Sequence, residues 1–350
     1  MKNSIYDILA LPRLAWEPAG GGGTSSLIAL RPFALGRAAP GLIGLIRNPR
    51  ARHNLGTDAC VARRDNVLAA APANRAELRD VLASFAARGI DLLVIDGGDG
   101  TIRDVLTCAG DAWGSAWPRI AILPSGKTNA LAVDLGVPAG WTFDDAIKAA
   151  TDGRIVKRAP LEVGPRGGGL AVRGFLFGGG GFVAATELAQ HTHKAGAFNG
   201  LAVGLALAGA IGSTLFGGAD NRWRRGSRIA LRYTDGVSAM HGAAIHSDGN
   251  RYVMLASTLE RFPMGLKPFG TPRPGMKTLV VDAPPRLLAW SAPGVLTGSE
   301  APAYEARGYH RIDAQAVEID LEAGFILDGE MFPGGAYTLR RAAPLRFVAP

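Results

Sequence analysis

Cysteine is nearly absent from this sequence, and charged residues are scarce. Only Cys60 and Cys108 occur among 350 residues, which is too few for a disulfide framework, so we expect both to be reduced. Charged residues make up 19% of the chain, below the roughly 25% of an average globular protein. A disulfide-stapled secreted domain is therefore excluded, while the 47% of hydrophobic residues is enough for a real core.

The sequence also lacks a recognisable secretory signal. Its first apolar stretch, residues 8–14, is broken by Pro12 and Arg13, so we expect a cytoplasmic protein. One apolar and glycine-rich stretch, residues 195–219, has the length needed to cross a bilayer. Its modest hydrophobicity and many small residues favour a buried helix over a helix that dips into the membrane.

Basic residues outnumber acidic ones by 38 to 30, which gives a formal net charge of +8. This excess attracts anionic partners such as nucleotides, nucleic acids or a membrane surface, and it does not choose among them. The length of 350 residues predicts two domains.

Residues 1–40 read as a weakly ordered extension, because the four glycines at 20–23 and the small polar residues after them are typical of linkers. Regular alternation follows. Buried strands are predicted at 41–47, 90–95 and 120–123, and helices at 75–88, 101–108, 128–135 and 142–150. Asn74 and Gly89 are expected to cap the first helix, and capping-box spacing occurs at Thr101 with Asp104 and at Thr142 with Asp145. Residues 41–155 are therefore predicted to form an α/β domain with a parallel sheet that binds a nucleotide.

The pattern changes after about residue 155. Short β-like runs separated by Gly, Pro and Asp turns predict a mostly antiparallel, β-rich domain over residues 156–335. Its strands are expected at 156–163, 228–233, 252–257, 277–281, 316–321 and 325–327.

The first candidate site is the glycine turn, residues 97–101, with the sequence Gly97-Gly98-Asp99-Gly100-Thr101. A predicted buried strand enters the turn and a helix leaves it. The glycines let phosphates approach the backbone, and the helix N-terminus offers N–H groups to an anion. Asp99 is expected to be exposed, where its carboxylate can act on a phosphate-bound Mg²⁺. The alternative interpretation is a simple tight turn.

A second loop, residues 124–132, has the same strand–loop–helix setting. Gly126 permits close approach, while Lys127, Thr128 and Asn129 can contact phosphate or sugar. Gly-Lys-Thr resembles the end of a P-loop, but the earlier Gly that a P-loop requires is absent, since residue 121 is Ala, so we reject that motif. Taken alone, this loop is better explained as a helix cap.

Two shorter motifs follow other predicted strands. Asn48-Pro49 begins a polar loop after the first strand, and Asp328-Gly329-Glu330 follows one of the last. Two carboxylates that flank a glycine can supply a base and a metal contact. Taken alone, a polar loop and an Asp-Gly turn are the simpler interpretations.

Together the four motifs resemble the diacylglycerol kinase catalytic-domain family, which includes sphingosine, ceramide and bacterial lipid kinases. The resemblance runs from about Leu42 to the C-terminus. Residues 97–101 match the family's Gly-Gly-Asp-Gly-Thr, and residues 124–132 resemble its Pro-x-Gly-Thr-x-Asn-x-x-Ala segment. Asn48-Pro49 and Asp328-Gly329-Glu330 match its first nucleotide loop and its late Asp-Gly-Glu. Four positions depart from the family pattern: Arg103, Lys127, Ala130 and Val183.

The resemblance implies that the α/β domain binds ATP and that residues 336–350 return to it. It implies an ATP-dependent lipid kinase that transfers the γ-phosphate to a hydroxyl of a diacylglycerol- or sphingoid-like lipid, with Mg²⁺. The nucleotide site would comprise Asn48, Pro49, Gly97, Gly98, Asp99, Gly100, Thr101, Asp104, Gly126, Lys127, Thr128 and Asn129. Asp328 would accept the proton of the hydroxyl, with Glu330 and Asp99 as catalytic residues and metal ligands.

Two alternatives stay open. The glycine turn also resembles that of NAD kinases, although no Asn-Glu or Asn-Asp loop of the dinucleotide site is present. A catalytically impaired pseudokinase would explain the four departures. The partners expected are a lipid substrate and, transiently, an anionic membrane surface near residues 222–228, which are rich in arginine; the alternative there is a solvated strand edge. No nucleic-acid partner is expected, and His191 with His193 has no further cluster of metal ligands.

Overall fold

The computed structural model describes residues 40–48, 64–110, 112–126, 128–181, 183, 222–235, 238–239 and 246–350. The predictions that lie outside these residues concern the extension up to residue 39, Pro49, Cys60, Lys127, His191, His193 and the apolar stretch 195–219. No helix within the described parts of the chain is long and apolar enough to span a membrane.

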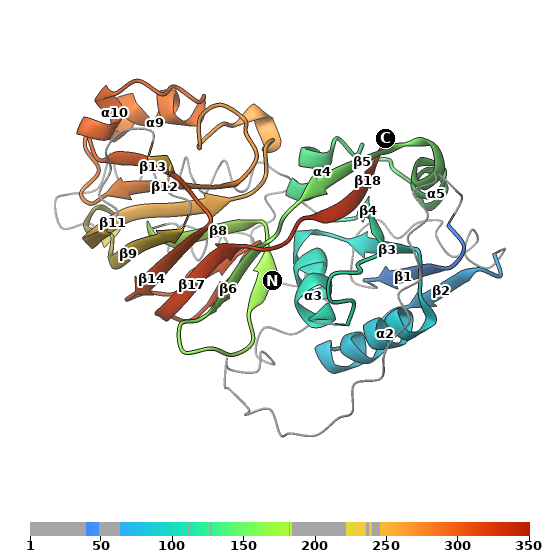
Figure 1. Ribbon diagram of the computed structural model, residues 1–350. Coiled ribbons are helices and arrows are strands. Elements are labelled where there is room, and N and C mark those ends of the chain that lie inside the picture. The colour runs from blue at the N-terminus through green and yellow to red at the C-terminus, as the bar shows by residue number, and fades with distance from the viewer. Residues whose placement is uncertain are drawn as a thin grey trace, which may run out of the picture.

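The first half of the molecule is built on a six-stranded sheet with the order β2-β1-β3-β4-β18-β5 (Figure 1). Five of its strands run parallel, and the edge strand β5 (Arg154–Arg158) is antiparallel to its neighbour β18. The five parallel strands are β1 (Ile43–Arg47), β2 (Val67–Ala70), β3 (Leu92–Gly97), β4 (Arg119–Pro124) and β18 (Leu345–Ala349).

Helices cover both faces of this sheet. Successive side chains of a strand point to opposite faces. Accordingly, Leu93 and Ile95 of β3 pack into one cluster with α2, α3 and α4, while Leu92 and Val94 pack into another with α5. The helices are α2 (Arg75–Arg88), α3 (Asp99–Ala109), α4 (Ala130–Leu135) and α5 (Phe143–Asp152).

Helix caps predicted from the sequence are partly confirmed. The side chain of Asn74 accepts a hydrogen bond from the backbone N of Glu77 (2.9 Å), and Thr142 forms a capping box with Asp145. The capping box predicted at Thr101 is wrong, because α3 begins two residues earlier, at Asp99, after an extended Gly98. Likewise α4 begins at Ala130 rather than at residue 128. The reason is that Asn129 adopts a left-handed conformation (φ 49°), which cannot continue a helix.

The second half is a large antiparallel sheet of twelve strands, capped at one end by α9 (Leu288–Leu296) and α10 (Ala303–Ala306) (Figure 1). The predicted fold class, a parallel α/β sheet followed by an antiparallel β-rich part, is confirmed. Its strands are β6 (Leu161–Pro165), β7 (Val172–Gly174), β8 (Leu176–Gly180), β9 (Ser227–Asp235), β10 (Ser238–Ala239), β11 (His246–Ser257), β12 (Met276–Asp282), β13 (Tyr309–Ala314), β14 (Ala316–Leu321), β15 (Phe325–Leu327), β16 (Glu330–Phe332) and β17 (Gly335–Arg341). A single turn of helix, α8 (Arg222–Arg225), precedes β9.

The single strand predicted at 156–163 is in fact two strands in different sheets. β5 ends at Arg158 in the first sheet and β6 begins at Leu161 in the second. Pro160 lies between them, and a proline has no N–H to give to a sheet ladder, so the chain can change sheets there. The chain crosses back after β17, and β18 then inserts between β4 and β5.

Candidate active site

The carboxyl ends of β1, β3 and β4 lie side by side, and polar residues bind one another there. The backbone N of Asn48 donates to the carbonyl oxygen of Asp96 (2.9 Å), and its side-chain Nδ2 donates to Oγ1 of Thr101 (2.9 Å). The hydroxyl of Ser125 donates to Oδ1 of Asp96 (2.5 Å). Asn48, Asp96 and Thr101 are buried. These bonds fix the glycine turn against the loop that follows β4.

Two glycines make this contact between loops possible. An added Cβ on Gly98 would lie 2.8 Å from the Cα of Gly126, and an added Cβ on Gly126 would lie 2.5 Å from the Cα of Gly98. Neither position tolerates a side chain unless the loops move apart. Gly100 differs, because its nearest neighbour would be the guanidinium of Arg103 at 3.8 Å. The protein itself therefore leaves space above Gly100, in the first turn of α3, for one added Cβ in ordinary contact with Arg103.

The carboxylate of Asp99 is not free in solvent, as the sequence suggested, but caps a neighbouring helix. It accepts hydrogen bonds from the backbone N of Ala130 (3.0 Å) and of Leu131 (3.3 Å), at the N-terminus of α4. Burial raises the pKa of Asp99, and these backbone bonds oppose the rise. The N-terminus of α3 itself has no side-chain cap, because Gly98 is its N-cap residue. Its first N–H groups are thus available to an anion.

Asp328 lies at the tip of a hairpin that reaches this edge from the second sheet. Strands β15 and β16 are joined by the two-residue turn Asp328-Gly329, in which both residues have positive φ (46° and 83°). Asp-Gly is the sequence that favours such a turn. The carboxylate accepts hydrogen bonds from the backbone N of Phe175 (3.0 Å) and of Leu176 (2.9 Å). Burial, and then the charge of Asp99, raise the pKa of Asp328 to about 7.

A network of two arginines and two carboxylates joins the two halves beside this hairpin. Arg103 of α3, only 2% exposed, binds Asp104 (3.0 Å) and Glu330 of β16 and donates to the carbonyl oxygen of Leu327 (3.3 Å). Arg75 of α2 binds the same two carboxylates, at 3.0 Å and 3.3 Å. Burial lowers the pKa of Arg103, but the negative charges of Asp104 and Glu330 raise it by more, so this guanidinium stays charged.

A match to a known family starts at β1 and ends in β6. Residues 45–163 match the family model of the diacylglycerol kinase catalytic domain. This segment, about a third of the chain, is therefore similar to a diacylglycerol kinase catalytic domain. A protein of Escherichia fergusonii named "Probable lipid kinase YegS" is 35% identical over 69 residues, which are 20% of this chain and 22% of that relative. The chain thus aligns with about a fifth of the relative's length.

Solved structures extend the likeness beyond the catalytic domain. A diacylglycerol kinase structure from Bacillus anthracis has a TM-score of 0.58 at 14% identity, covering 89% of this chain and 98% of that chain. A second structure from the same organism has a TM-score of 0.61 at 16% identity, covering 91% and 99%. At these identities the likeness shows the fold, and it includes both sheets.

The fold brings most of the predicted residues together with the late Asp-Gly-Glu. Asn48, the glycine turn, Gly126 and Asn129 are joined by the contacts above and by the bond from the backbone N of Gly126 to Oδ1 of Asn129 (3.0 Å). Thr128 lies half-buried in the same loop. Asp104 binds the arginines rather than facing the turn, and Pro49 and Lys127 lie outside the described residues.

The predicted role of Glu330 as a metal ligand does not fit its contacts. Both of its oxygens bind arginines, Oε1 to Arg75 and Oε2 to Arg103. Over the parts of the chain that the structure describes, no group of three or more His, Cys, Asp or Glu side chains is placed to hold a metal. The predictions also missed Arg75, Ser125 and the N–H groups of Phe175 and Leu176. Their roles come from contacts between distant segments, and no local pattern in the sequence signals them.

Proposed function

We propose that this protein is an ATP-dependent lipid kinase, which transfers the γ-phosphate of ATP to a hydroxyl of a diacylglycerol- or sphingoid-like lipid. The observation that carries the proposal is the position of Asp328. A half-buried carboxylate with a pKa of about 7 comes from the second sheet and lies close enough to Asp99, in the glycine turn, for the two charges to interact. A phosphate-binding turn faces a base, as phosphoryl transfer to a hydroxyl requires.

The glycine turn fits the phosphates of a nucleotide. The uncapped N-terminus of α3 provides N–H donors and the positive end of a helix dipole, and the space above Gly100 lets an anion approach the backbone. Asn48 and Asn129 border the same turn. These residues would hold ATP, with Mg²⁺ brought in on its phosphates, since Mg²⁺ commonly uses one or two carboxylates and substrate phosphates. Asp99 is the carboxylate of this turn that would contact it.

Asp328 is suited to move the proton. As the lipid hydroxyl oxygen bonds to the γ-phosphorus, its proton passes to the carboxylate of Asp328, and the bond from the γ-phosphorus to the β–γ bridging oxygen breaks to release ADP. A base with a pKa of about 7 is half deprotonated at neutral pH, so it can take up this proton and release it again. The left-handed backbone at Asp328 is held by the N–H groups of Phe175 and Leu176.

Arg103 replaces the Asn of the family pattern and is a positioning residue in this proposal. Its guanidinium binds Glu330 and the carbonyl oxygen of Leu327, the two residues that flank the turn carrying Asp328. It therefore sets the position of the hairpin tip relative to α3. Glu330 and Asp104 act through this arginine and not as metal ligands.

The test is an incubation with labelled ATP, Mg²⁺ and a panel of acceptors: diacylglycerol, sphingosine, ceramide and NAD. We expect the label in a lipid product, and we expect Asp328→Asn to lose this transfer while it still binds ATP. Label in NAD phosphate would support the NAD kinase alternative. Nucleotide binding without any product would support a pseudokinase. That alternative is suggested by the four positions that depart from the family pattern: Arg103, Lys127, Ala130 and Val183.

A lipid substrate requires contact with a membrane, and one end of the second half is suited to it. Trp290 is 81% exposed and Leu287 is 57% exposed, both near the start of α9. The residue that follows the basic turn α8 contacts the segment that leads to α9, because an added Cβ on Gly226 would lie 2.8 Å from the Cβ of Ala283. Aromatic, apolar and basic side chains together suit an anionic interface. We therefore propose a cytoplasmic protein that contacts the membrane transiently at this end.

A further inference from the structure

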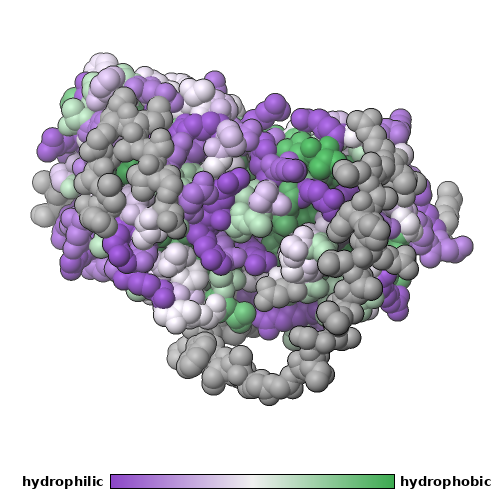
Figure 2. All heavy atoms as spheres, in the orientation of Figure 1, coloured by the Kyte–Doolittle hydropathy of each residue, from purple (hydrophilic) through white to green (hydrophobic). Residues whose placement is uncertain are grey.

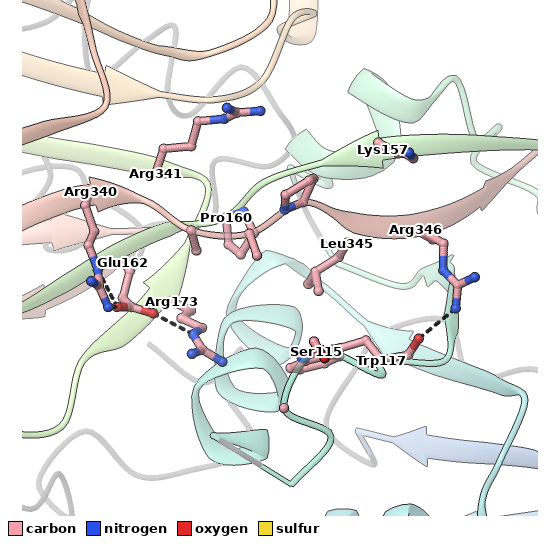
Figure 3. Close-up of a pocket in the computed structure, with 14 residues that line it drawn as sticks. Ser115, Trp117, Lys157, Pro160, Glu162, Arg173, Arg340, Arg341, Leu345 and Arg346 are labelled. Atoms are coloured by element: carbon pink, nitrogen blue, oxygen red, sulfur yellow. Dashed lines mark hydrogen bonds and ion pairs between the residues drawn. The ribbon is translucent and has the colours of Figure 1, made fainter. Parts of the chain in front are cut away.

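A cavity of about 630 Å³ lies where the chain passes between the two sheets (Figure 3). In the described residues the backbone makes this passage twice, at Ala159-Pro160 and at residues 342–344. The two crossings are bonded to each other, since the backbone N of Ala342 donates to the carbonyl oxygen of Pro160 (2.9 Å). Pro160 and residues 342–344 line the cavity. We call it the hinge pocket.

The hinge pocket is separate from the candidate active site. Trp117 and Ser115, which precede β4, contribute to its wall. The glycine turn lies at the opposite ends of these strands, beyond their carboxyl ends. At about 3.3 Å per residue, the six residues of β4 separate the two places by nearly 20 Å.

Five residues with cationic side chains line the hinge pocket, together with a single acidic residue, Glu162. The cations are Lys157, Arg173, Arg340, Arg341 and Arg346. Burial would raise the pKa of Glu162, but hydrogen bonds from Arg340 and Arg173 lower it, so Glu162 is ionised and shared by these two arginines. The excess is therefore four positive charges.

Two of these cations have no partner for their charge among the described residues. Within the described chain, the side chains of Lys157 and Arg341 make no ion pair and no hydrogen bond. Arg346 donates to the carbonyl oxygen of Trp117 (2.9 Å). Clustered like charges raise the local positive potential and so favour an anion from solution. On the face shown in Figure 2, hydrophilic residues border the hollow between the two halves, and apolar surface lies within it.

The cations come from both sheets. Lys157 and Arg346 belong to β5 and β18 of the first sheet, whereas Arg173, Arg340 and Arg341 belong to β7 and β17 of the second. Figure 3 shows Arg173 and Arg340 meeting at Glu162 on one side, with Arg346 on the other and Leu345 and Pro160 between them. An anion held here would bind both halves at once.

One of these cations also contacts the helix that starts at the glycine turn. Nη1 of Arg173 donates to the carbonyl oxygen of Gly110 (3.1 Å), and its backbone N donates to Oγ1 of Thr107 (3.0 Å). Both partners lie at the C-terminal end of α3. A ligand bound to Arg173 would therefore be connected, through this residue, to the far end of the helix whose first turn is the proposed phosphate site.

We infer that the hinge pocket is a second anion site, which binds a phosphate group and braces the two halves against each other. The phosphate belongs either to a soluble phosphate ester or to the headgroup of an anionic lipid. The volume of about 630 Å³ suits a small organic phosphate, and Trp117, Pro160 and Leu345 offer apolar surface to its body. Arginine and lysine are the side chains that bind phosphate most strongly.

The test compares wild type with the double variant Lys157→Gln/Arg341→Gln. The matched control is Arg88→Gln/Lys148→Gln, which removes the same two charges from exposed positions on α2 and α5. Binding is measured calorimetrically with inorganic phosphate and with glycerol 3-phosphate, and by sedimentation with phosphatidylcholine vesicles that do or do not contain phosphatidate. ATP binding of each variant is measured alongside, and unfolding by urea checks that each variant is folded.

We expect wild type and control to bind phosphate or glycerol 3-phosphate equally, and the double variant at least tenfold more weakly, with ATP affinity unchanged. Loss of soluble-ester binding identifies a soluble ligand, while loss of phosphatidate-dependent sedimentation alone identifies a lipid headgroup. Bound phosphate should also raise the free energy of unfolding of wild type and control, but not of the double variant. Equal binding of every probe by all three proteins, or no binding by wild type, overturns the inference. Absence of kinase activity does not bear on it.

Discussion

Substitution of Asp328 by Asn should separate catalysis from stability. At pH 8 the wild-type carboxylate is charged and half-buried, with a pKa of about 7 in place of 3.8. That difference of about 3 units corresponds to about 4 kcal/mol. An uncharged amide of the same shape avoids this cost and keeps an oxygen for the N–H groups of Phe175 and Leu176. We therefore expect Asp328→Asn to be more stable than wild type at pH 8, by up to about 4 kcal/mol.

The sign of the pH dependence follows from the raised pKa. Between about pH 4 and pH 7 the folded protein holds a proton on Asp328 that the unfolded chain has lost, so the contribution of this group to stability is present at low pH and disappears as the pH rises through 7. The stability difference between Asp328→Asn and wild type should therefore be small near pH 4 and largest above pH 7.

Turnover should change in the opposite direction. Removal of a general base typically lowers the rate by about 10²–10⁴-fold, so Asp328→Asn should lose lipid phosphorylation while it gains stability. In wild type, kcat/KM should rise as the pH increases through about 7, because only the carboxylate form accepts the proton.

Urea unfolding at pH 5 and pH 8, together with turnover across the same range, measures both effects. Asp80→Asn, which removes an exposed carboxylate from α2, is the control and should change neither quantity. The reasoning is refuted if Asp328→Asn is less stable than wild type at pH 8, or if it turns over lipid at the wild-type rate.

Three further predictions concern the turn, the arginine network and the membrane. Gly100→Ala should weaken ATP binding at least tenfold in calorimetry, and it should leave the fold as stable as wild type or up to about 1 kcal/mol more stable. Gly98→Ala should lower the free energy of unfolding in urea by about 1–3 kcal/mol, because the two loops must separate. Equal ATP affinity in Gly100→Ala would contradict the placement of the phosphates. Arg103→Met should cost about 3–5 kcal/mol by leaving buried carboxylates without their cation, and adding Glu330→Met should recover part of that loss; no recovery would mean that the pair is not coupled. Trp290→Ser should weaken sedimentation with anionic vesicles while activity on lipid dispersed in detergent is retained, and unchanged sedimentation would exclude this contact.

Local patterns predicted the elements that local physics decides. Helix α2 is capped by Asn74 at its start and by Gly89 at its end, as predicted. Strands β14 and β15 have the bounds that alternation and turn residues predicted. The glycine turn lies between a buried strand and a helix, as expected.

Contacts between distant segments decided the rest. Arg103 reads as an ordinary helix residue, and its burial depends on Glu330, which arrives from the second sheet. The turn at Asp328 is an Asp-Gly turn, the simpler interpretation, and also carries the proposed base. The position of the Asp328 carboxylate depends on the N–H groups of Phe175 and Leu176, which no spacing around residue 328 reveals. Asp99 was expected to be exposed to solvent. The sequence could not show that it caps α4, because this contact depends on how two loops pack.

The place of β18 has a consequence for how the protein is made. This strand lies between β4 and β5, and its Phe347 and Val348 are buried in the two clusters on either face of the first sheet. On the ribosome, β4 and β5 emerge long before β18, and they have no common neighbour until it arrives. The proposed nucleotide-binding half therefore cannot complete its core during early synthesis. We expect a nascent chain that ends after β17 to stay open to proteases and chaperones in this half, even if the second sheet has already formed.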